Sequence, residues 1–293
     1  MASRLTYLIA FLISCLCVTS AFGQDSKEAT PGKKSADEIA KELANPAGSL
    51  ASLNFNLQYT EFTGDLRGAD DQESTALTFQ PVLPFPVGDK GRKFIFRPLF
   101  SLEFDQPVFD GDFDSADPNL GDTSFDLVYA GTEMTSKNDG FLWGIGLAGT
   151  VPTATDSDLA GNQWRFGPEL FGGIIRKWGV VGALVANQFN AGGSNNTTYS
   201  VMTAQYFYAY GLGNGWQISS SPVLSYDWKA DGDNHWTVPL GFGLAKTTSI
   251  GNHNWKFQFQ IQKFVEQPDA FGPDWLVKFT ITPVIENPFL KIF

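Results

Sequence analysis

The chain has 293 residues and a formal net charge of −11, with 17% charged and 14% aromatic residues. The acidic balance argues against nucleic-acid binding, which calls for clustered Lys and Arg, and against simple attachment to an anionic surface. The length allows one large β-barrel or two ordinary domains. The chain has fewer charged and more aromatic residues than most soluble proteins.

Residues 1–23 are typical of a secretory signal peptide. Arg4 supplies the positive start, Leu5–Val18 the apolar centre and Ala21–Gly23 the small-residue cleavage pattern. An uncleaved helical anchor is one alternative, and Leu12–Cys15 could be a lipoprotein cleavage site. The only cysteines lie in this segment, so we expect an exported chain without disulfides or thiol chemistry.

Residues 24–48 predict a polar linker followed by a short periplasmic helix. Ser35–Glu38 has the composition of a capping box, and the apolar stripe after it predicts a helix over 36–43. Asn45-Pro46 ends that helix. Two roles remain open for it: it plugs one mouth of a barrel, or it is a tether.

Period-two alternation dominates the rest of the chain, and Asn254–Glu266 shows it best. Aromatic or aliphatic side chains occupy one face of this segment, and Lys or Gln occupies the other. A closed barrel in lipid needs that pattern, with apolar residues outside and polar residues inside. The segments that we expect to be strands are 51–63, 74–86, 93–104, 122–135, 140–152, 162–174, 178–190, 198–211, 215–228, 235–247, 253–265 and 273–284.

The connections between these segments give a second signal. Those after the odd strands are long or polar, for example Asp105–Gly121, and most of those after the even strands are tight, for example Ser136–Asp139. Outer-membrane barrels have short periplasmic turns and longer outer loops. The sequence therefore predicts an all-β fold over 49–293, a twelve-stranded antiparallel transmembrane β-barrel with both termini on the periplasmic side.

The inward face is where we expect function to lie. With this strand phasing, charged groups of both signs and several amides line the lumen, a pattern that favours a narrow wet passage braced by ion pairs. A network that only holds the barrel's shape is the alternative. The predicted lining residues are Arg97, Glu103, Asp126, Arg165, Glu169, Gln205, Asp227, Lys256, Gln258, Gln260 and Lys278.

Two other sequence patterns are weaker evidence for a binding site. Asp110, Asp112 and Asp114 begin like a calcium loop, but the glycine and glutamate that such a loop needs are missing, so a solvated acidic loop is the simpler interpretation. Gly144–Gly149 matches a dinucleotide fingerprint without the helix that must follow. We expect no cofactor. We expect these glycines to reduce the side-chain volume on the inward face of the fifth strand.

The two histidines do not suggest an enzyme. His235 and His253 fall at opposite ends of neighbouring predicted strands, and catalysis would need a histidine beside a nucleophile. His235 with a serine such as Ser225 is the only pairing to consider. We therefore expect a protein that is not an enzyme, with a lipid-modifying barrel enzyme as the least favoured alternative.

The chain resembles a family of outer-membrane β-barrel proteins described as transporters or as the phenol meta-cleavage-pathway outer-membrane type, whose members are often mislabelled neuromedin U. The resemblance runs from about Lys41 to Ile285. The most specific block is Trp236–Gly241 with Lys246. Shorter matches are Leu43–Pro46, Gln80–Val82, Leu120–Asp122, Pro152–Ala154, Gly167-Pro168 and Gly215-Trp216. The tail Asn287–Phe293 departs from the family pattern, although Phe293 resembles a terminal barrel-assembly signal.

The resemblance implies a Gram-negative outer-membrane channel that admits a small, aromatic or hydrophobic solute. The expected partners are outer-membrane lipid, lipopolysaccharide, the barrel assembly machinery and that solute, with no nucleic acid. The alternative is a structural or adhesion barrel with a closed lumen and acidic surface loops.

Overall fold

The computed structural model describes residues 34–88, 91–195 and 197–287. The predicted signal peptide and Phe293 lie outside the described residues. One compact unit begins at Ala36 and contains all the strands given below. Within the described ranges, no helix is both long and apolar enough to span a lipid bilayer.

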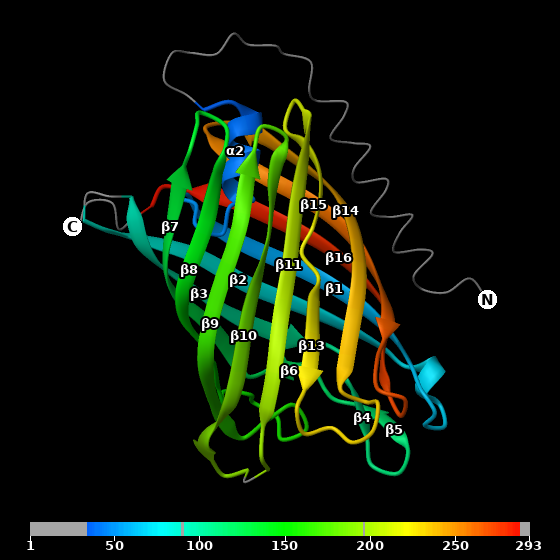
Figure 1. Ribbon diagram of the computed structural model, residues 1–293. Coiled ribbons are helices and arrows are strands. Elements are labelled where there is room, and N and C mark those ends of the chain that lie inside the picture. The colour runs from blue at the N-terminus through cyan, green and yellow to red at the C-terminus, as the bar shows by residue number, and fades with distance from the viewer. Residues whose placement is uncertain (1–33, 89–90, 196, 288–293) are drawn as a thin grey trace. The chain divides into compact units, whose positions relative to one another are not determined.

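The wall of this unit is a closed antiparallel barrel (Figure 1). Its described strands fill twelve wall positions, and β1 pairs with β16 to close the ring. In chain order they are β1 (Ala51–Thr63), β2 (Glu73–Val87), β3 (Arg92–Glu103), β7 (Thr123–Met134), β8 (Gly140–Val151), β9 (Gln163–Arg176), β10 (Gly179–Gly193), β11 (Ser200–Gly213), the interrupted strand β12 (Trp216–Ser220) with β13 (Val223–Asp227), β14 (Trp236–Ile250), β15 (His253–Glu266) and β16 (Gly272–Ile285). The predicted all-β, twelve-stranded barrel is confirmed, because every predicted strand forms, one of them in two pieces.

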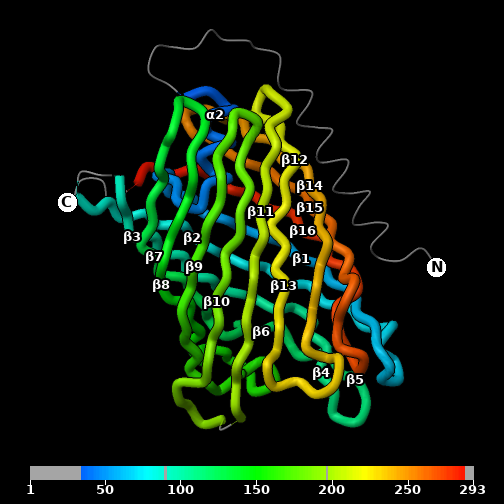
Figure 2. Tube along the Cα trace, viewed as in Figure 1, coloured from blue at the N-terminus to red at the C-terminus, as the bar shows by residue number. Residues whose placement is uncertain are grey.

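The two ends of the barrel differ, as the connection lengths predicted (Figure 2). Turns such as 177–178 and 251–252 are tight, whereas the loop between β3 and β7 holds three short strands. These strands are β4 (Pro107–Phe109), β5 (Phe113–Ser115) and β6 (Asn119–Leu120); the connection from β1 to β2 carries the short helix η2 (Ala69–Asp71). We call the two ends the tight-turn end and the long-loop end.

The outer surface is apolar because alternate side chains of each strand point away from the lumen. Ile145 is 58% exposed and Leu240 is 59% exposed. Phe55, Phe79 and Phe100 stack across β1, β2 and β3, with ring centroids 4.9 and 6.2 Å apart. An apolar surface of this extent needs lipid, detergent or a partner to cover it.

One predicted strand is broken. The alternation over 215–228 predicts a continuous strand, but the structure ends β12 at Ser220 and begins β13 at Val223. Pro222 has no N–H to donate, so the ladder to β14 cannot continue through it. As a result, β12 pairs with β14 only over Trp216–Ile218, and β13 only over Ser225–Tyr226.

The expectation of a polar interior is wrong for one part of the barrel. Towards the tight-turn end, apolar side chains of β3 and β7–β11 point inwards and pack together. Phe171 is one of them, and it fits because Gly144 on β8 leaves room for its ring. The cluster consists of Ala47, Ile95, Val128, Ala130, Leu142, Phe171, Ile175, Val180, Leu184 and Phe207, with Ala44 and Val82 against it. Ala44 and Ala47 of the N-terminal segment pack against the strand residues of this cluster.

The predicted helix forms as α2 (Ala36–Leu43) and lies at the tight-turn end of the barrel (Figure 1). Its buried face carries Ile39 and Ala40, which are 3% and 1% exposed. The helix contacts β11, β12, β14 and β15. Of the two roles left open by the sequence, this placement agrees with a plug.

Candidate functional site: the lumen cavity

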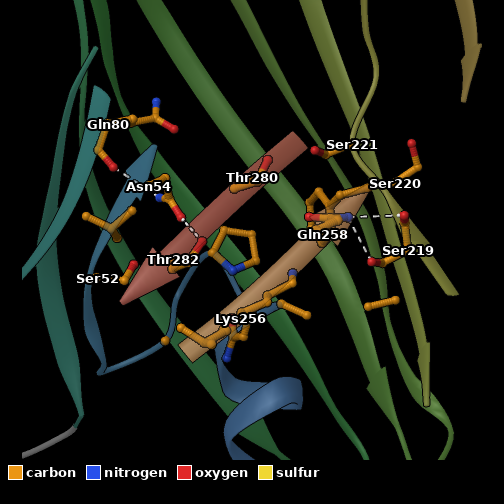
Figure 3. A pocket seen from close by; sticks show the side chains of 18 of the residues that line it. Ser52, Asn54, Gln80, Ser219, Ser220, Ser221, Lys256, Gln258, Thr280 and Thr282 are labelled. Atoms are coloured by element: carbon orange, nitrogen blue, oxygen red, sulfur yellow. Dashed lines mark hydrogen bonds between the residues drawn. The ribbon is translucent and has the colours of Figure 1, made fainter. Parts of the chain in front are cut away.

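The barrel encloses a cavity of about 240 Å³ next to α2 (Figure 3). The N-terminal segment, from Glu42 to Leu50, forms one side of it. The remaining lining comes from inward side chains of β1, β2, β3, β10, β11, β12, β15 and β16, together with Ser221. The volume is just below the ~300–1,000 Å³ of typical ligand pockets, so the space suits a small solute.

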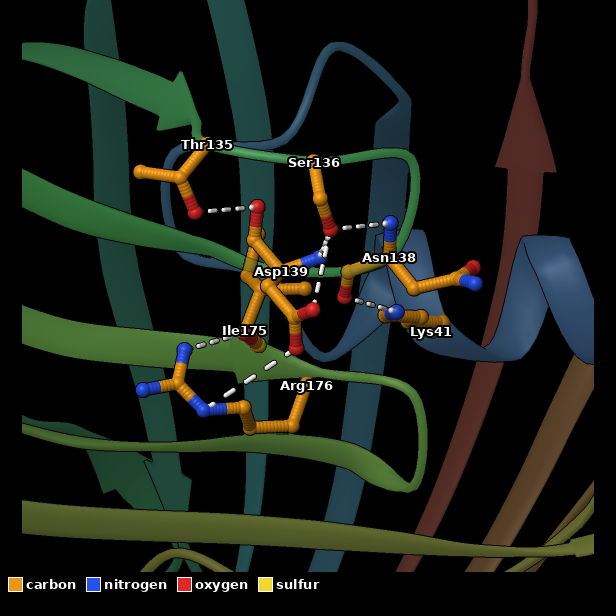
Figure 4. A network of polar contacts seen from close by, with 7 residues as sticks. All are labelled: Lys41, Thr135, Ser136, Asn138, Asp139, Ile175 and Arg176. Carbon is orange, nitrogen blue, oxygen red and sulfur yellow. Dashed lines mark hydrogen bonds and ion pairs between the residues drawn. The ribbon is translucent and has the colours of Figure 1, made fainter.

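Hydrogen bonds from α2 to two of the tight turns hold it in place. The backbone N–H of Gly215 donates to Oδ1 of Asp37 at 2.5 Å. Lys41 Nζ donates to the carbonyl oxygen of Asn138 at 3.4 Å (Figure 4). Burial lowers the pKa of Lys41, and the nearby Asp139 carboxylate partly offsets that effect. The helix is therefore attached at two separate turns on the rim by a few polar contacts.

The turn that receives Lys41 is itself ordered by side-chain hydrogen bonds (Figure 4). The hydroxyl of Ser136 donates to Oδ2 of Asp139 at 2.9 Å and accepts the Asp139 N–H at 3.1 Å. Arg176 on β9 lies 4.0 Å from the other oxygen of Asp139. These contacts present the Asn138 carbonyl to the helix.

The chain after α2 is fixed to the barrel wall. Asn45 Nδ2 donates to Oγ1 of Thr132 on β7 at 3.3 Å. Lys93 on β3 donates from Nζ to the Ala47 carbonyl at 2.8 Å and to Ser49 Oγ at 3.0 Å. This part of the segment is more firmly held than the helix, because the Lys93 contact with Ala47 is buried.

One side of the cavity is a ladder of neutral polar groups across β16, β1 and β2 (Figure 3). Thr282 Oγ1 donates to Asn54 Oδ1 at 2.8 Å, and Asn54 Nδ2 donates to the Gln80 carbonyl at 3.1 Å. Thr280 makes the equivalent bond to Asn56 at 2.8 Å. The ladder keeps these groups hydrogen-bonded and their side chains fixed along the cavity.

Two glutamines of β15 replace the ladder bonds lost at the broken strand. Gln258 Nε2 donates to the carbonyl oxygen and the hydroxyl of Ser219, at 3.1 and 2.9 Å. Gln260 Oε1 accepts from Ser220 Oγ at 2.9 Å and from Ser221 N at 3.1 Å. Both predicted lining residues therefore also support the wall.

Tyrosines of β11 also form hydrogen bonds across the gap between the broken strand and β14. Tyr206 and Tyr208 donate from their hydroxyls to the carbonyl oxygens of Pro239 and Gly241 on β14, at 3.0 and 2.9 Å. Gln205 Nε2 donates to the Ser221 carbonyl at 3.3 Å. Side chains hold the wall together where backbone pairing is missing.

Arg97 lies between two carboxylates inside the barrel. Its Nη2 is 2.7 Å from Asp126 Oδ2 and 3.5 Å from Glu169 Oε1. Glu169 is only 2% exposed, and the guanidinium group of Arg97 is the cation that faces both carboxyl groups.

Lys256 and Lys278 also line the cavity, but differently. Each is half-buried, and neither ammonium group has a hydrogen-bond or ion-pair partner among the described residues. Both lie on the β15–β16 pair, and the charge of Lys278 acts unfavourably on Lys256.

The other predicted lining residues lie elsewhere. Glu103 lines a second cavity of about 320 Å³, shared with Gln58 and Thr60. Arg165 is stacked over the ring of Tyr199, 4.4 Å from its centroid. Asp227 ends β13, where its carboxylate accepts from the Lys229 N–H at 2.8 Å. None of these three belongs to the cavity beside α2.

Some lining residues were not predicted. The residues from Glu42 to Leu50 were assigned to the linker and the start of the barrel, and Leu184 and Phe207 lie on the inward faces of β10 and β11. Small residues blur the alternation of β10, so its inward face could not be assigned from the sequence. The run of three serines before Pro222 was the available signal for the broken strand.

The acidic loop and the histidines do not form sites in the part of the chain that the structure describes. No three His, Cys, Asp or Glu residues there could hold a metal ion together. Asp112 and Asp114 instead accept the N–H of the residue that follows each of them, at 3.0 and 2.8 Å. His235 stacks on Tyr226, and its Nδ1 lies 2.7 Å from the Asp227 carbonyl oxygen.

The comparison with solved structures finds a protein of the same fold. No family model matches the chain, and no curated protein matches it. Among solved structures, an outer-membrane channel from Pseudomonas putida F1 has a TM-score of 0.56 at 13% identity, covering 80% of this chain and 94% of that one. The two chains share a fold.

Two further structures are less similar. OpdQ from Pseudomonas aeruginosa has a TM-score of 0.37 at 9% identity, covering 80% of this chain and 97% of that one. A FadL homologue from Pseudomonas aeruginosa has a TM-score of 0.37 at 10% identity, with 86% and 94% covered. Scores this low do not establish a shared fold.

Proposed function

We propose that this protein is an outer-membrane channel through which a small solute crosses, and that α2 is its plug. The observation that carries the proposal is a closed ring of strands with an apolar exterior and a polar cavity inside it. Lipid would cover the exterior, and water would fill the cavity. The fold shared with the Pseudomonas putida channel supports this function.

In the proposed orientation, the tight turns and α2 face the periplasm, and the long loops face outwards. This follows the usual asymmetry of outer-membrane barrels, which have short periplasmic turns and longer outer loops. The lining residues that we assign to the passage are Arg97, Gln205, Lys256, Gln258, Gln260 and Lys278.

Planar-bilayer recording and liposome uptake of small solutes test the proposal. We expect brief, low-conductance openings, because α2 occupies the mouth. A heat-modifiability gel first shows that the sample is a folded barrel. A folded sample with neither conductance nor solute uptake would instead support a structural barrel with a closed lumen.

A further inference from the structure

The cavity beside α2 contains two cationic side chains that none of the described residues neutralises. Its charged lining residues are Glu42, Arg97, Lys256 and Lys278. Arg97 is paired with Asp126 and Glu169. The other two cations, Lys256 and Lys278, have no such partner among the described residues.

Glu42 does not supply the missing negative charge. It is the only carboxylate among the lining residues, and it interacts electrostatically with Lys93, which lies on β3. No electrostatic interaction is found between Glu42 and Lys256, whereas Lys256 interacts unfavourably with Lys278. Among the residues that the structure describes, the two ammonium groups on the β15–β16 side of the cavity therefore have no compensating carboxylate.

The register of the strands keeps both lysines on the same inner face. Lys256 is paired with Thr282, and Lys278 is paired with Gln260, across the β15–β16 ladder. Thr282 and Gln260 are buried and already hydrogen-bonded, and neither is an anion. A buried charge is tolerated only when it is paired or hydrated, so a bound anion would stabilise this arrangement.

The cavity also has an apolar side. Leu43, Leu184 and Phe207 line it together with the lysines. Leu184 and Phe207 belong to the inward apolar cluster of β10 and β11. An inorganic anion would leave these side chains against water, whereas an organic acid would cover them.

We propose that this cavity binds a small organic carboxylate, with its carboxylate held by Lys256 and Lys278 and its apolar body against Leu184 and Phe207. This inference rests on the proposed channel function, since it names the solute class that the lumen would select.

Binding to the full chain in detergent tests the inference without relying on transport. Calorimetric titration would compare benzoate with benzamide, which lacks the charge, with acetate, which lacks the ring, and with phosphate. We expect benzoate to bind at least about tenfold more tightly than each of the others. Equal binding of benzamide, or tighter binding of phosphate, would overturn the proposal.

Substitutions locate the site. Lys256→Gln and Lys278→Gln should each weaken benzoate binding by about tenfold, because each removes a charge-assisted hydrogen bond. Lys229→Gln, in the loop after β13, is the matched control and should leave binding unchanged. A heat-modifiability gel verifies that each variant folds. Unchanged binding in the folded double variant would overturn the proposal.

The outcomes separate this inference from the channel function. Benzoate binding without conductance or uptake would retain the anion site and reject the channel. Uptake of neutral solutes without benzoate binding would retain the channel and reject the anion site.

Discussion

Gln258 on β15 donates both to the carbonyl oxygen and to the hydroxyl of Ser219 on β12, at 3.1 and 2.9 Å. The strand between these two residues is β14, so the contact passes inside the wall across a neighbouring strand. It lies next to the break in the wall strand. Buried side-chain amides therefore connect strands here, as backbone hydrogen bonds do elsewhere in the barrel.

Replacing Gln260 should weaken the barrel. Gln260→Leu removes the acceptor for Ser220 Oγ and for the Ser221 N–H, at 2.9 and 3.1 Å. Leaving such buried donors unpaired costs ~1–3 kcal/mol. Urea unfolding in detergent measures the loss. Gln262→Leu is the control, because Gln262 is also buried on the inward face of β15 but has no hydrogen-bond partner among the described residues. Equal losses in the two variants would contradict the prediction.

Loosening the helix should open the channel. Asp37→Ala removes the acceptor for the Gly215 N–H at 2.5 Å. A hydrogen bond of ~1 kcal/mol corresponds to about a fivefold change in the equilibrium between seated and released helix. Single-channel recording should show openings about fivefold more often. Lys137→Ala, in the exposed turn beside Asn138, should behave like the wild type. Unchanged gating in Asp37→Ala would show that this bond does not hold the plug.

Removing the buried guanidinium should be costly. Arg97→Met leaves Asp126 and the 2%-exposed Glu169 without their cation. Breaking a buried pair in this way typically costs ~3–5 kcal/mol, and neutralising the partners together with it restores much of the loss. We therefore expect the triple variant Arg97→Met, Asp126→Asn, Glu169→Gln to unfold at higher urea than Arg97→Met alone.

The exposed pair provides the comparison for Arg97. Arg176 and Asp139 are 4.0 Å apart and 42% and 45% exposed. Arg176→Met should cost less than ~1 kcal/mol, because water screens such pairs. If this variant were as unstable as Arg97→Met, burial would not be the reason for the larger loss.

A methyl group added to β8 should disturb the inner apolar cluster. A Cβ at Gly144 would lie 2.2 Å from the Phe171 ring, whereas one at Gly172 would have its nearest neighbour at 4.0 Å. Overpacking of a buried site costs ~1–3 kcal/mol. Gly144→Ala should therefore unfold at lower urea than the wild type, and Gly172→Ala should be neutral or slightly stabilised. The reverse order would place Phe171 outside the packed interior.

Period-two patterning predicted nearly all of the wall, because each strand has one face towards the exterior and one towards the lumen. It could not predict that Pro222 breaks a strand, since proline is also tolerated within several other strands of this chain. It also missed the inner apolar cluster around Phe171 and Val180. There the N-terminal segment packs against the inner face of the strands. The alternation along a strand does not indicate what fills the lumen beside it.

The candidate site was only partly accessible to sequence reasoning. The amides and lysines of β15 and β16 lie on the predicted face, because their alternation is unbroken. Glu42 is the only carboxylate that lines the cavity together with Lys256 and Lys278. Which charged residues share the cavity depends on how strands distant in sequence are arranged around the ring. The bonds of Gln258 and Gln260 to the serines likewise arise from the break in β12–β13.

The pairing of Ala51 with Ile285 joins the beginning of the ring to its end. A nascent chain that stops before β16 has two unpaired edges, and such edges are prone to wrong associations. The same seam brings Thr280 and Thr282 to Asn56 and Asn54, and β16 delivers Lys278. The polar lining of the lumen is therefore incomplete until β16 has joined the ring.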